Sequence, residues 1–176
     1  TASLLLGRET RAHLTAVYGY ARLVDQLGDE VEGDRLAILD DFERDVDRVF
    51  AGTPPQHPLL QRLAVTVREC NLPREPFRRL IEANRRDQHT QSYDTFDELV
   101  EYCDYSANPV GELVLHVFDR ATPERIALSD KVCTALQLAE HWQDIGEDFR
   151  RGRIYLPAED RDRFGDQCTV MLDRRH

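Results

Sequence analysis

Hydrophobic positions recur with helical spacing along almost the whole chain. In the first long segment, Leu14 and Tyr18 begin a stripe of about one side chain per turn, and Asp25 and Asp29 continue it. Positions three or four residues apart lie on one face of an α-helix. The opposite side of this segment is also apolar, so we expect residues 10–30 to form a helix that is buried nearly all round.

Capping residues and prolines divide the rest of the chain into further helices. Thr10 and Asp34 are expected N-caps, and Thr95 with Glu98 has the pattern of a capping box. The predicted helices cover residues 10–30, 34–52, 58–71, 73–88, 95–102, 110–118 and 122–149, with a short one after residue 157. A strand at 113–118 is the alternative for one of them, but it would be isolated. No two alternating runs flank a hairpin turn, so the sequence predicts one all-α domain over residues 1–176.

Carboxylates are paired at two places on these helices. Asp25 and Asp29 lie four residues apart, and so do Asp144 and Asp148. Like charges at this spacing repel each other, and a buried charge needs a partner or a metal. Hard oxygen ligands suit Mg²⁺, which commonly binds one or two carboxylates together with substrate phosphates. Two such pairs facing each other would hold Mg²⁺ around a diphosphate. A solvated helix end is the alternative for the first pair.

The late helix carries the stronger of the two signals. Apolar residues cover most of its surface. Its polar stripe consists of Gln137, Glu140, His141, Asp144, Glu147 and Asp148. No basic residue occurs between Lys131 and Arg150, whereas a solvated face normally mixes both signs. The stripe therefore favours a cation site, with an exposed acidic face beside Arg150 as the alternative.

Composition narrows the classes of partner. The net charge of −10 leaves no broad basic surface for nucleic acid, so a DNA-binding helical domain is a poor interpretation. No apolar run approaches the roughly 18 residues of a membrane span, and no signal peptide is evident. We therefore expect a cytoplasmic protein, with peripheral membrane contact still open. Cys70, Cys103, Cys133 and Cys168 lack metal-site spacing and are expected to be reduced thiols.

Three motifs together resemble the squalene and phytoene synthase family of head-to-head trans-prenyl transferases. They are YGYARLVDQLGDE at residues 18–30, YCDYSANPVG at 102–111 and QDIGEDFRRGRIYLP at 143–157. Their order and spacing match throughout, so the resemblance covers essentially the whole chain. The SANPVG form of the second motif is similar to the hydroxysqualene synthase branch of bacterial hopanoid pathways.

The resemblance implies an isoprenoid-synthase-type helical bundle around a central cavity. Small residues at Ala21, Gly28, Ala107 and Gly111 would leave room there for an isoprenoid tail or bring helices close together. The family usually continues with further C-terminal helices. This chain is therefore expected to be incomplete, with apolar surface left on its first and last long helices.

The activity implied by the resemblance is Mg²⁺-dependent. Such an enzyme ionises presqualene diphosphate and releases diphosphate, giving hydroxysqualene or squalene for hopanoid biosynthesis. One alternative is a phytoene or presqualene diphosphate synthase, which joins two prenyl diphosphates such as farnesyl diphosphate. Another is a catalytically silent relative that serves as an assembly or binding module.

The resemblance also implies roles for individual residues. The Mg²⁺ ligands are Asp25, Asp29, Glu140, Asp144 and Asp148. The catalytic residues are Tyr102, near the reacting carbocation, and Arg22, against the diphosphate. The substrate-binding residues are Tyr18, Arg22, Asn108, Gln137, Arg153 and Tyr155. Plain packing is the alternative for the tyrosines. Gln26 and Glu140 depart from the Asp and the Asn that many members have at these positions.

Overall fold

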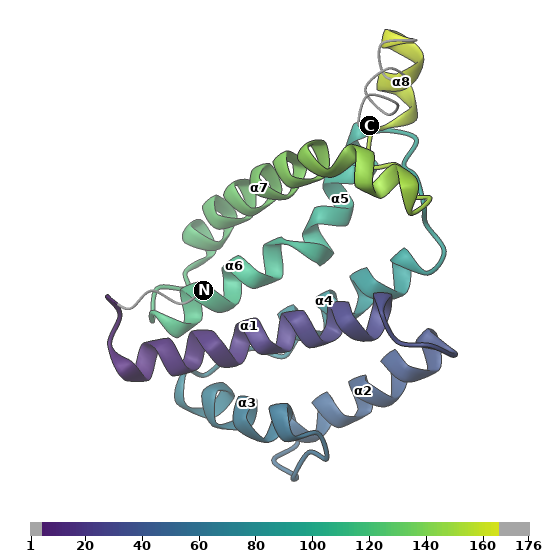
Figure 1. Ribbon diagram of the computed structural model, residues 1–176. Helices are drawn as coiled ribbons and strands as arrows, with labels where there is room; N and C mark the ends of the chain where they lie inside the picture. The colour runs from purple at the N-terminus through teal and green to yellow at the C-terminus, as the bar shows by residue number, and fades with distance from the viewer. Residues whose placement is uncertain (1–4, 166–176) are drawn as a thin grey trace.

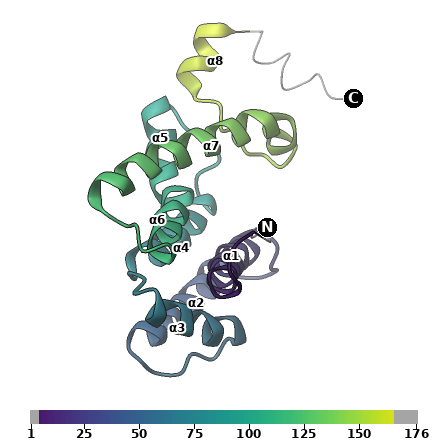
Figure 2. The same cartoon turned by 90° about the vertical axis from the view of Figure 1, so that its left-hand side faces the viewer.

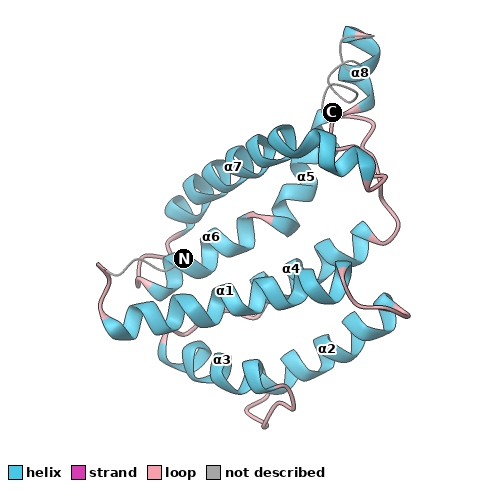
Figure 3. Cartoon of the chain, viewed as in Figure 1, coloured by secondary structure: helices cyan, strands magenta, loops and turns pink. Residues whose placement is uncertain are grey.

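The computed structural model describes residues 5–165 and consists of helices joined by loops (Figure 3). In chain order the helices are α1 (Arg8–Asp29), α2 (Arg35–Phe50), α3 (Pro58–Glu69), α4 (Glu75–Asp87), α5 (Phe96–Ser106), α6 (Asn108–Val117), α7 (Pro123–Arg150) and α8 (Ala158–Phe164). Within the described residues the only extended pairing is an isolated bridge between Ser92 and Ile154. The all-α prediction is confirmed. The strand alternative for residues 113–118 is wrong, because this segment completes α6.

Local capping explains where several of these helices begin. The Asp34 side chain accepts a hydrogen bond from the backbone at the start of α2, and Thr95 and Glu98 form the expected capping box of α5. Thr122 caps α7, the longest helix, in the same way. The expected cap at Thr10 is wrong, because this residue lies inside the first turn of α1, which begins without a side-chain cap.

The helices lie in layers on either side of α1 (Figures 1 and 2). α2 and α3 cover one side of α1, and α4 and α6 cover another. α7 packs on α6 and α5, so it lies across these helices from α1. The acidic ends of α1 and α7 are therefore held by the intervening helices rather than by packing directly on each other.

Two apolar clusters hold this arrangement together. The larger one joins α1 to α2, α3, α4 and α6 and includes Val17, Tyr20 and Val24 of α1. The Tyr20 hydroxyl donates to the backbone oxygen of Phe77 at 2.9 Å, and the two rings meet edge to face at 4.8 Å. Burying an aromatic or branched side chain contributes roughly 1.5–3 kcal/mol. A smaller cluster, which includes Tyr102 and other residues of α4, α5 and α7, lies beside the acidic helix ends.

The burial of α1 and α7 differs from the sequence-based expectation. Tyr18 of α1 is 63% exposed, so this helix is not buried all round. On α7 only Leu138 and His141 are buried, whereas Leu136 is 66% exposed and Val132 is similarly open. The expected apolar surface on the last long helix is therefore present. It arises because α6 and α5 cover only one face of α7.

The remaining structural expectations concern thiols and membranes. Cys70, Cys103 and Cys133 are free, and Cys168 lies outside the described residues. Among the helices that the structure describes, none is long and apolar enough to cross a bilayer.

Candidate active site

A polar cavity of about 300 Å³ opens between α1, α4, α5, α7 and the segment after α7. Its lining residues are Asp25, Asp29, Leu80, Ala83, Asn84, Asp87, Tyr102, Ser106, Gln137, Glu140, His141, Asp144, Asp148, Arg153 and Tyr155. Five carboxylates from the two predicted acidic helices are among them. The size is at the lower end of ordinary ligand pockets.

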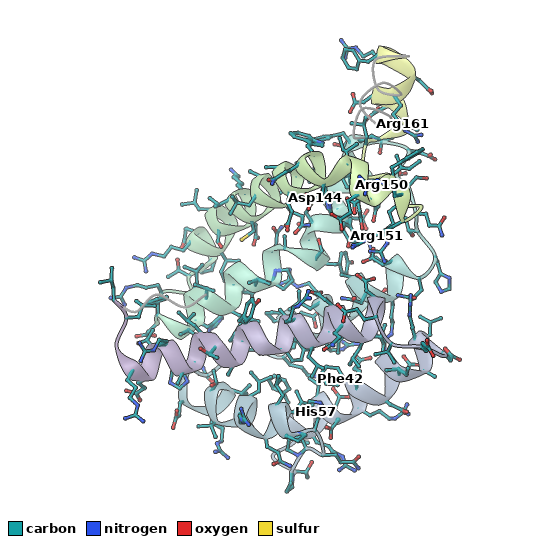
Figure 4. The ribbon with its side chains drawn as sticks, in the orientation of Figure 1. Phe42, His57, Asp144, Arg150, Arg151 and Arg161 are labelled. Carbon is teal, nitrogen blue, oxygen red and sulfur yellow. The ribbon has the colours of Figure 1, made fainter. Side chains whose placement is uncertain are left out.

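The two acidic pairs meet in this cavity because α1 and α7 both bring their C-terminal turns to it. Asp25 and Asp29 come from the end of α1, and Asp144 and Asp148 come from the end of α7. Asp144 lies near the end of α7 (Figure 4), and Glu140 lies one turn earlier. Both pairs line the cavity instead of forming a helix end surrounded by solvent. The i,i+4 spacing turns both members of each pair to the same side, as the sequence predicted.

Like charges and burial act together on these carboxylates. Burial raises the pKa of Asp25, as does the charge of Asp29, while a hydrogen bond from Asn84 lowers it. Burial and the charge of Asp144 likewise raise the pKa of Asp148. A cation between the pairs would relieve this repulsion, because it favours the charged form of every carboxylate near it.

Arg153 connects the segment after α7 to the end of α1. Its two terminal nitrogens lie 2.5 and 3.5 Å from the two carboxylate oxygens of Asp29. Burial lowers the pKa of Arg153, but the hydrogen bond with Asp29 and the charges of Asp29, Asp87 and Tyr155 together outweigh it, so the pKa is raised. A planar guanidinium in this position is suited to bidentate recognition of phosphate oxygens.

Comparison with known proteins assigns the chain to a family. The profile of the squalene/phytoene synthase family matches residues 1–175. The chain belongs to this family. It is 36% identical to a hydroxysqualene synthase of Zymomonas mobilis over 90% of this chain and 54% of that protein. It is 32% identical to a phytoene synthase of Mycobacterium tuberculosis over 92% of this chain and 53% of that one. The chain thus spans about half the length of these curated relatives.

Solved structures of family members have the same fold. The crystal structure of squalene synthase HpnC from Alicyclobacillus acidocaldarius superposes with a TM-score of 0.91 at 50% identity, covering 99% of this chain and 66% of that one. A dehydrosqualene synthase crystallised with a ligand gives a TM-score of 0.83 at 31% identity, covering 95% of this chain and 58% of that one. The helical bundle expected from the family resemblance is therefore confirmed, and the relatives extend beyond it.

The carboxylates of the cavity fit the Mg²⁺ ion that members of this family use. Asp25, Asp29, Asp144 and Asp148 offer hard oxygen atoms in two facing pairs, and Glu140 adds a fifth carboxylate. Such a set would bind Mg²⁺ through a few carboxylates and leave coordination positions for phosphate oxygens.

Asp87 is a cavity residue that the motif analysis missed. The Tyr102 hydroxyl donates to Asp87 Oδ2 at 2.9 Å, and Asp87 Oδ1 is buried without a hydrogen-bond partner among the described residues. Burial raises the Asp87 pKa to about 6. A signal was available in the sequence, because Asn84 and Asp87 continue the stripe of the buried Leu80 at i+4 and i+7 on α4. The same reasoning had singled out Asp25 on α1.

His141 was noted only as part of the polar stripe, but it supports the wall of the cavity. Its ring stacks on Tyr155 at 3.8 Å between centroids and 13° between planes. Gln137 Nε2 lies 3.3 Å from His141 Nε2, so the amide donates to the neutral ring. Burial lowers the His141 pKa to about 4, which keeps the ring neutral near pH 7. Gln137 and Tyr155 therefore have defined orientations beside the carboxylates.

Three predicted site residues do not line this cavity. Tyr18 is exposed on α1, and Arg22 is exposed and pairs with Glu30 at 3.5 Å, although its charge still lowers the pKa of Asp25. Asn108 is 1% exposed and binds other side chains. Its amide donates to Asp104 at 2.7 Å and its oxygen accepts from Thr134 at 3.1 Å. Asn108 thus fixes α6 against α5 and α7, and this contact is structural.

Proposed function

We propose that this chain forms the diphosphate-binding part of a Mg²⁺-dependent enzyme of the squalene synthase type. The proposed reaction is ionisation of presqualene diphosphate with release of diphosphate. Water then captures the rearranged carbocation and loses a proton to give hydroxysqualene for hopanoid biosynthesis, or a hydride from a reductant such as NADPH gives squalene. The observation that carries the proposal is the meeting of Asp25 and Asp29 with Asp144 and Asp148 in one polar cavity.

Different residues of the cavity would act on the departing diphosphate and on the carbocation that it leaves behind. When bound, Mg²⁺ would neutralise the negative charge that develops on the departing diphosphate. Arg153 is free to exchange Asp29 for a diphosphate oxygen, since both are anionic oxygen partners. The ring centroids of Tyr102 and Tyr155 lie 6.1 Å apart at the cavity wall. Each ring would stabilise a nearby carbocation by about 0.5–2 kcal/mol.

The neutral state of His141 also suits this chemistry. A protonated imidazole beside the forming carbocation would repel it, and burial keeps the ring uncharged near neutral pH. The small polar cavity accommodates the charged head group. The isoprenoid tail of the substrate needs an apolar surface outside this cavity. Tyr18 of α1 and Leu136 of α7 are exposed apolar side chains that could contribute to such a surface.

The relatives support the choice of branch. Two of them carry the names hydroxysqualene synthase and squalene synthase, at 36% and 50% identity. Phytoene synthases match at 32–35% identity, so head-to-head condensation of two prenyl diphosphates is the second candidate reaction. A catalytically silent assembly module is a third hypothesis. It is motivated by Glu140 and Gln26, which differ from the residues that many family members have at these positions. Four retained carboxylates argue against it, because an inactive protein would be more stable without their repulsion.

The decisive experiment identifies products. The chain extended through its natural C-terminus is incubated with Mg²⁺ and either presqualene diphosphate or farnesyl diphosphate, each with and without NADPH, and the extracted lipids are analysed by mass spectrometry. Hydroxysqualene or squalene from presqualene diphosphate would support the proposal. A C30 condensation product formed from farnesyl diphosphate, without turnover of presqualene diphosphate, would replace it with the second reaction. No turnover of either substrate would favour the silent module.

A further inference from the structure

A second cluster of potential metal ligands lies at the other end of α1 from the acidic pair. Glu9 and His13 are four residues apart on α1, and Glu69 is the last residue of α3, which packs beside it. One ligand atom from each of these three side chains lies within 4.8 Å of the other two. The motif analysis did not single out any of them.

The ring of His13 is held in the orientation of a ligand. The residue is 8% exposed, and its Nδ1 lies 3.0 Å from the hydroxyl of Thr66 on α3. This contact turns Nε2 toward the carboxylate of Glu69, at 3.6 Å. A partner on one ring nitrogen commonly fixes the tautomer and aims the other nitrogen at a metal.

The carboxylates of the cluster have no strong cationic partner. In the part of the chain that the structure describes, no arginine or lysine lies within ion-pair distance of Glu9, and Glu69 pairs only with His13. Arg62 lines the same hollow but forms no ion pair with either glutamate there. Without such a partner, the two carboxylates are open to a cation from solution.

We propose that Glu9, His13 and Glu69 bind a divalent transition-metal ion, with Zn²⁺ as the best fit. One imidazole nitrogen and two carboxylate oxygens are ordinary Zn²⁺ ligands, and a water would complete four-coordination. At bond lengths of roughly 2.0–2.2 Å, tetrahedral ligand atoms lie roughly 3.4 Å apart, close to the existing separation of 3.6 Å between His13 Nε2 and Glu69 Oε2. One carboxylate oxygen of Glu9 lies within 4.8 Å of a ligand atom of His13 and of Glu69, so its exposed side chain needs only a small movement to complete the set.

An ion can reach the cluster from solvent through a neighbouring hollow. The cluster borders a hollow of about 470 Å³ between α1 and α3, lined also by Ala12, Ala16, Leu59 and Val65. A protonated His13 paired with Glu69 would account for that contact, but it leaves the second carboxylate unexplained. A bound ion accounts for all three side chains. Its effect would be to clamp the first half of α1 to α3, distant from the chemistry at Asp25.

The test is Zn²⁺ binding by calorimetry, with excess Mg²⁺ present to occupy the acidic cavity, and Co²⁺ absorbance as a second readout. The variants are His13→Gln, Glu69→Gln and Glu9→Gln, and the matched control is the double variant Asp25→Asn/Asp144→Asn. We expect one Zn²⁺ per chain in the wild type and the control. Affinity should fall at least tenfold in each of the other three, and Zn²⁺ should raise the melting temperature only where the cluster is intact.

Two outcomes would overturn the proposal. One is the absence of Zn²⁺ binding by the wild type at micromolar concentration. The other is binding that survives in the His13 and Glu69 variants but disappears in the double aspartate variant, which would place the ion in the acidic cavity. Glu9 and Glu69 are exposed, so their variants keep the test valid if the buried His13→Gln variant fails to fold.

Discussion

At the residue scale, the cavity contains carboxylates that are partly withdrawn from water. Asp87 on α4 follows the buried Leu80 and Asn84, and Asp25 on α1 lies 3.5 Å from Asn84. Both aspartates have raised pKa values because burial disfavours their charged forms. The protein tolerates this destabilisation at the site proposed to bind a cation and a diphosphate.

Neutralising one aspartate of each pair should abolish ligand binding without unfolding the chain. In Asp25→Asn and Asp144→Asn we expect the thermal stabilisation by Mg²⁺ plus diphosphate to disappear, which corresponds to at least tenfold weaker binding, or about 1.4 kcal/mol. Melting temperatures without ligand should stay equal or rise slightly, because repulsion is relieved. The measurement is a thermal melt with and without both ligands.

The matched control for this pair of variants is Glu147→Gln. Glu147 lies on the same helix and pairs with Arg151 rather than lining the cavity. The control should retain the stabilisation by Mg²⁺ and diphosphate. Equal retention by all three variants would show that the acidic pairs are not metal ligands.

Asp87→Asn should stabilise the metal-free chain in a pH-dependent way. The folded-state pKa of Asp87, about 6, lies above its unfolded value of roughly 3.9. The native state therefore binds the proton more tightly, and wild-type stability falls as pH rises between these two values. We expect the variant to gain on the order of 1 kcal/mol over the wild type at pH 7.5 and almost nothing at pH 4. Urea unfolding at both pH values measures this, and an equal gain at both would contradict it.

At the element scale, small residues decide how closely the helices approach each other. A Cβ added to Gly28 of α1 would lie 2.2 Å from Oδ1 and 2.9 Å from Cγ of Asn84 on α4. A Cβ on Gly111 of α6 would lie 2.3 Å from Ser129 and 2.5 Å from Cys133 on α7. Helix contact therefore explains these two glycines. Asn84 in turn lies 3.5 Å from Asp25, so the α1–α4 approach also positions a residue of the cavity.

Gly28→Ala should destabilise the protein and disturb the cavity. Overpacking typically costs about 1–3 kcal/mol, which outweighs the helix propensity of up to roughly 1 kcal/mol gained from alanine. The control is Gly19→Ala on the same helix, whose Cβ would meet only the end of the Leu59 side chain at 3.2 Å. Chemical unfolding should show a net loss of about 1–2 kcal/mol for the first variant and little change for the second. Similar values for both would mean that the Asn84 contact relaxes freely.

At the scale of the whole molecule, α7 is covered on one side only. Leu128, Val132 and Leu136 form a row of exposed apolar side chains along it. Exposed contiguous patches of this kind mark surfaces that bind something else. The chain covers 66% of the squalene synthase HpnC structure that it matches, so the relatives have additional chain available for such contacts.

The chain as given should therefore self-associate and turn over substrate poorly, because a carbocation site must exclude water. Light scattering after size exclusion should show oligomers that shift toward monomer in Leu128→Glu. Glu124→Gln on the same helix is the control and should not change the oligomeric state. A version extended through the natural C-terminus should be less associated and more active. Equal turnover by a monomeric short form would show that residues 1–176 already contain the whole functional unit.

The sequence alone predicted the helices, the starts of several of them and the two i,i+4 acidic pairs. These are local properties: a helix face follows from spacing and a helix start from its cap, as α5 and α7 illustrate. Only the tertiary structure decided which faces are covered. Tyr18 is exposed and Asn108 is a packing residue because neighbouring helices, not spacing, set their surroundings. Spacing puts Asp87 on the same face of α4 as the buried Leu80, but only the tertiary structure shows that this face lines the cavity. The meeting of His13 with Glu69 is likewise a contact between two helices that no local pattern contains.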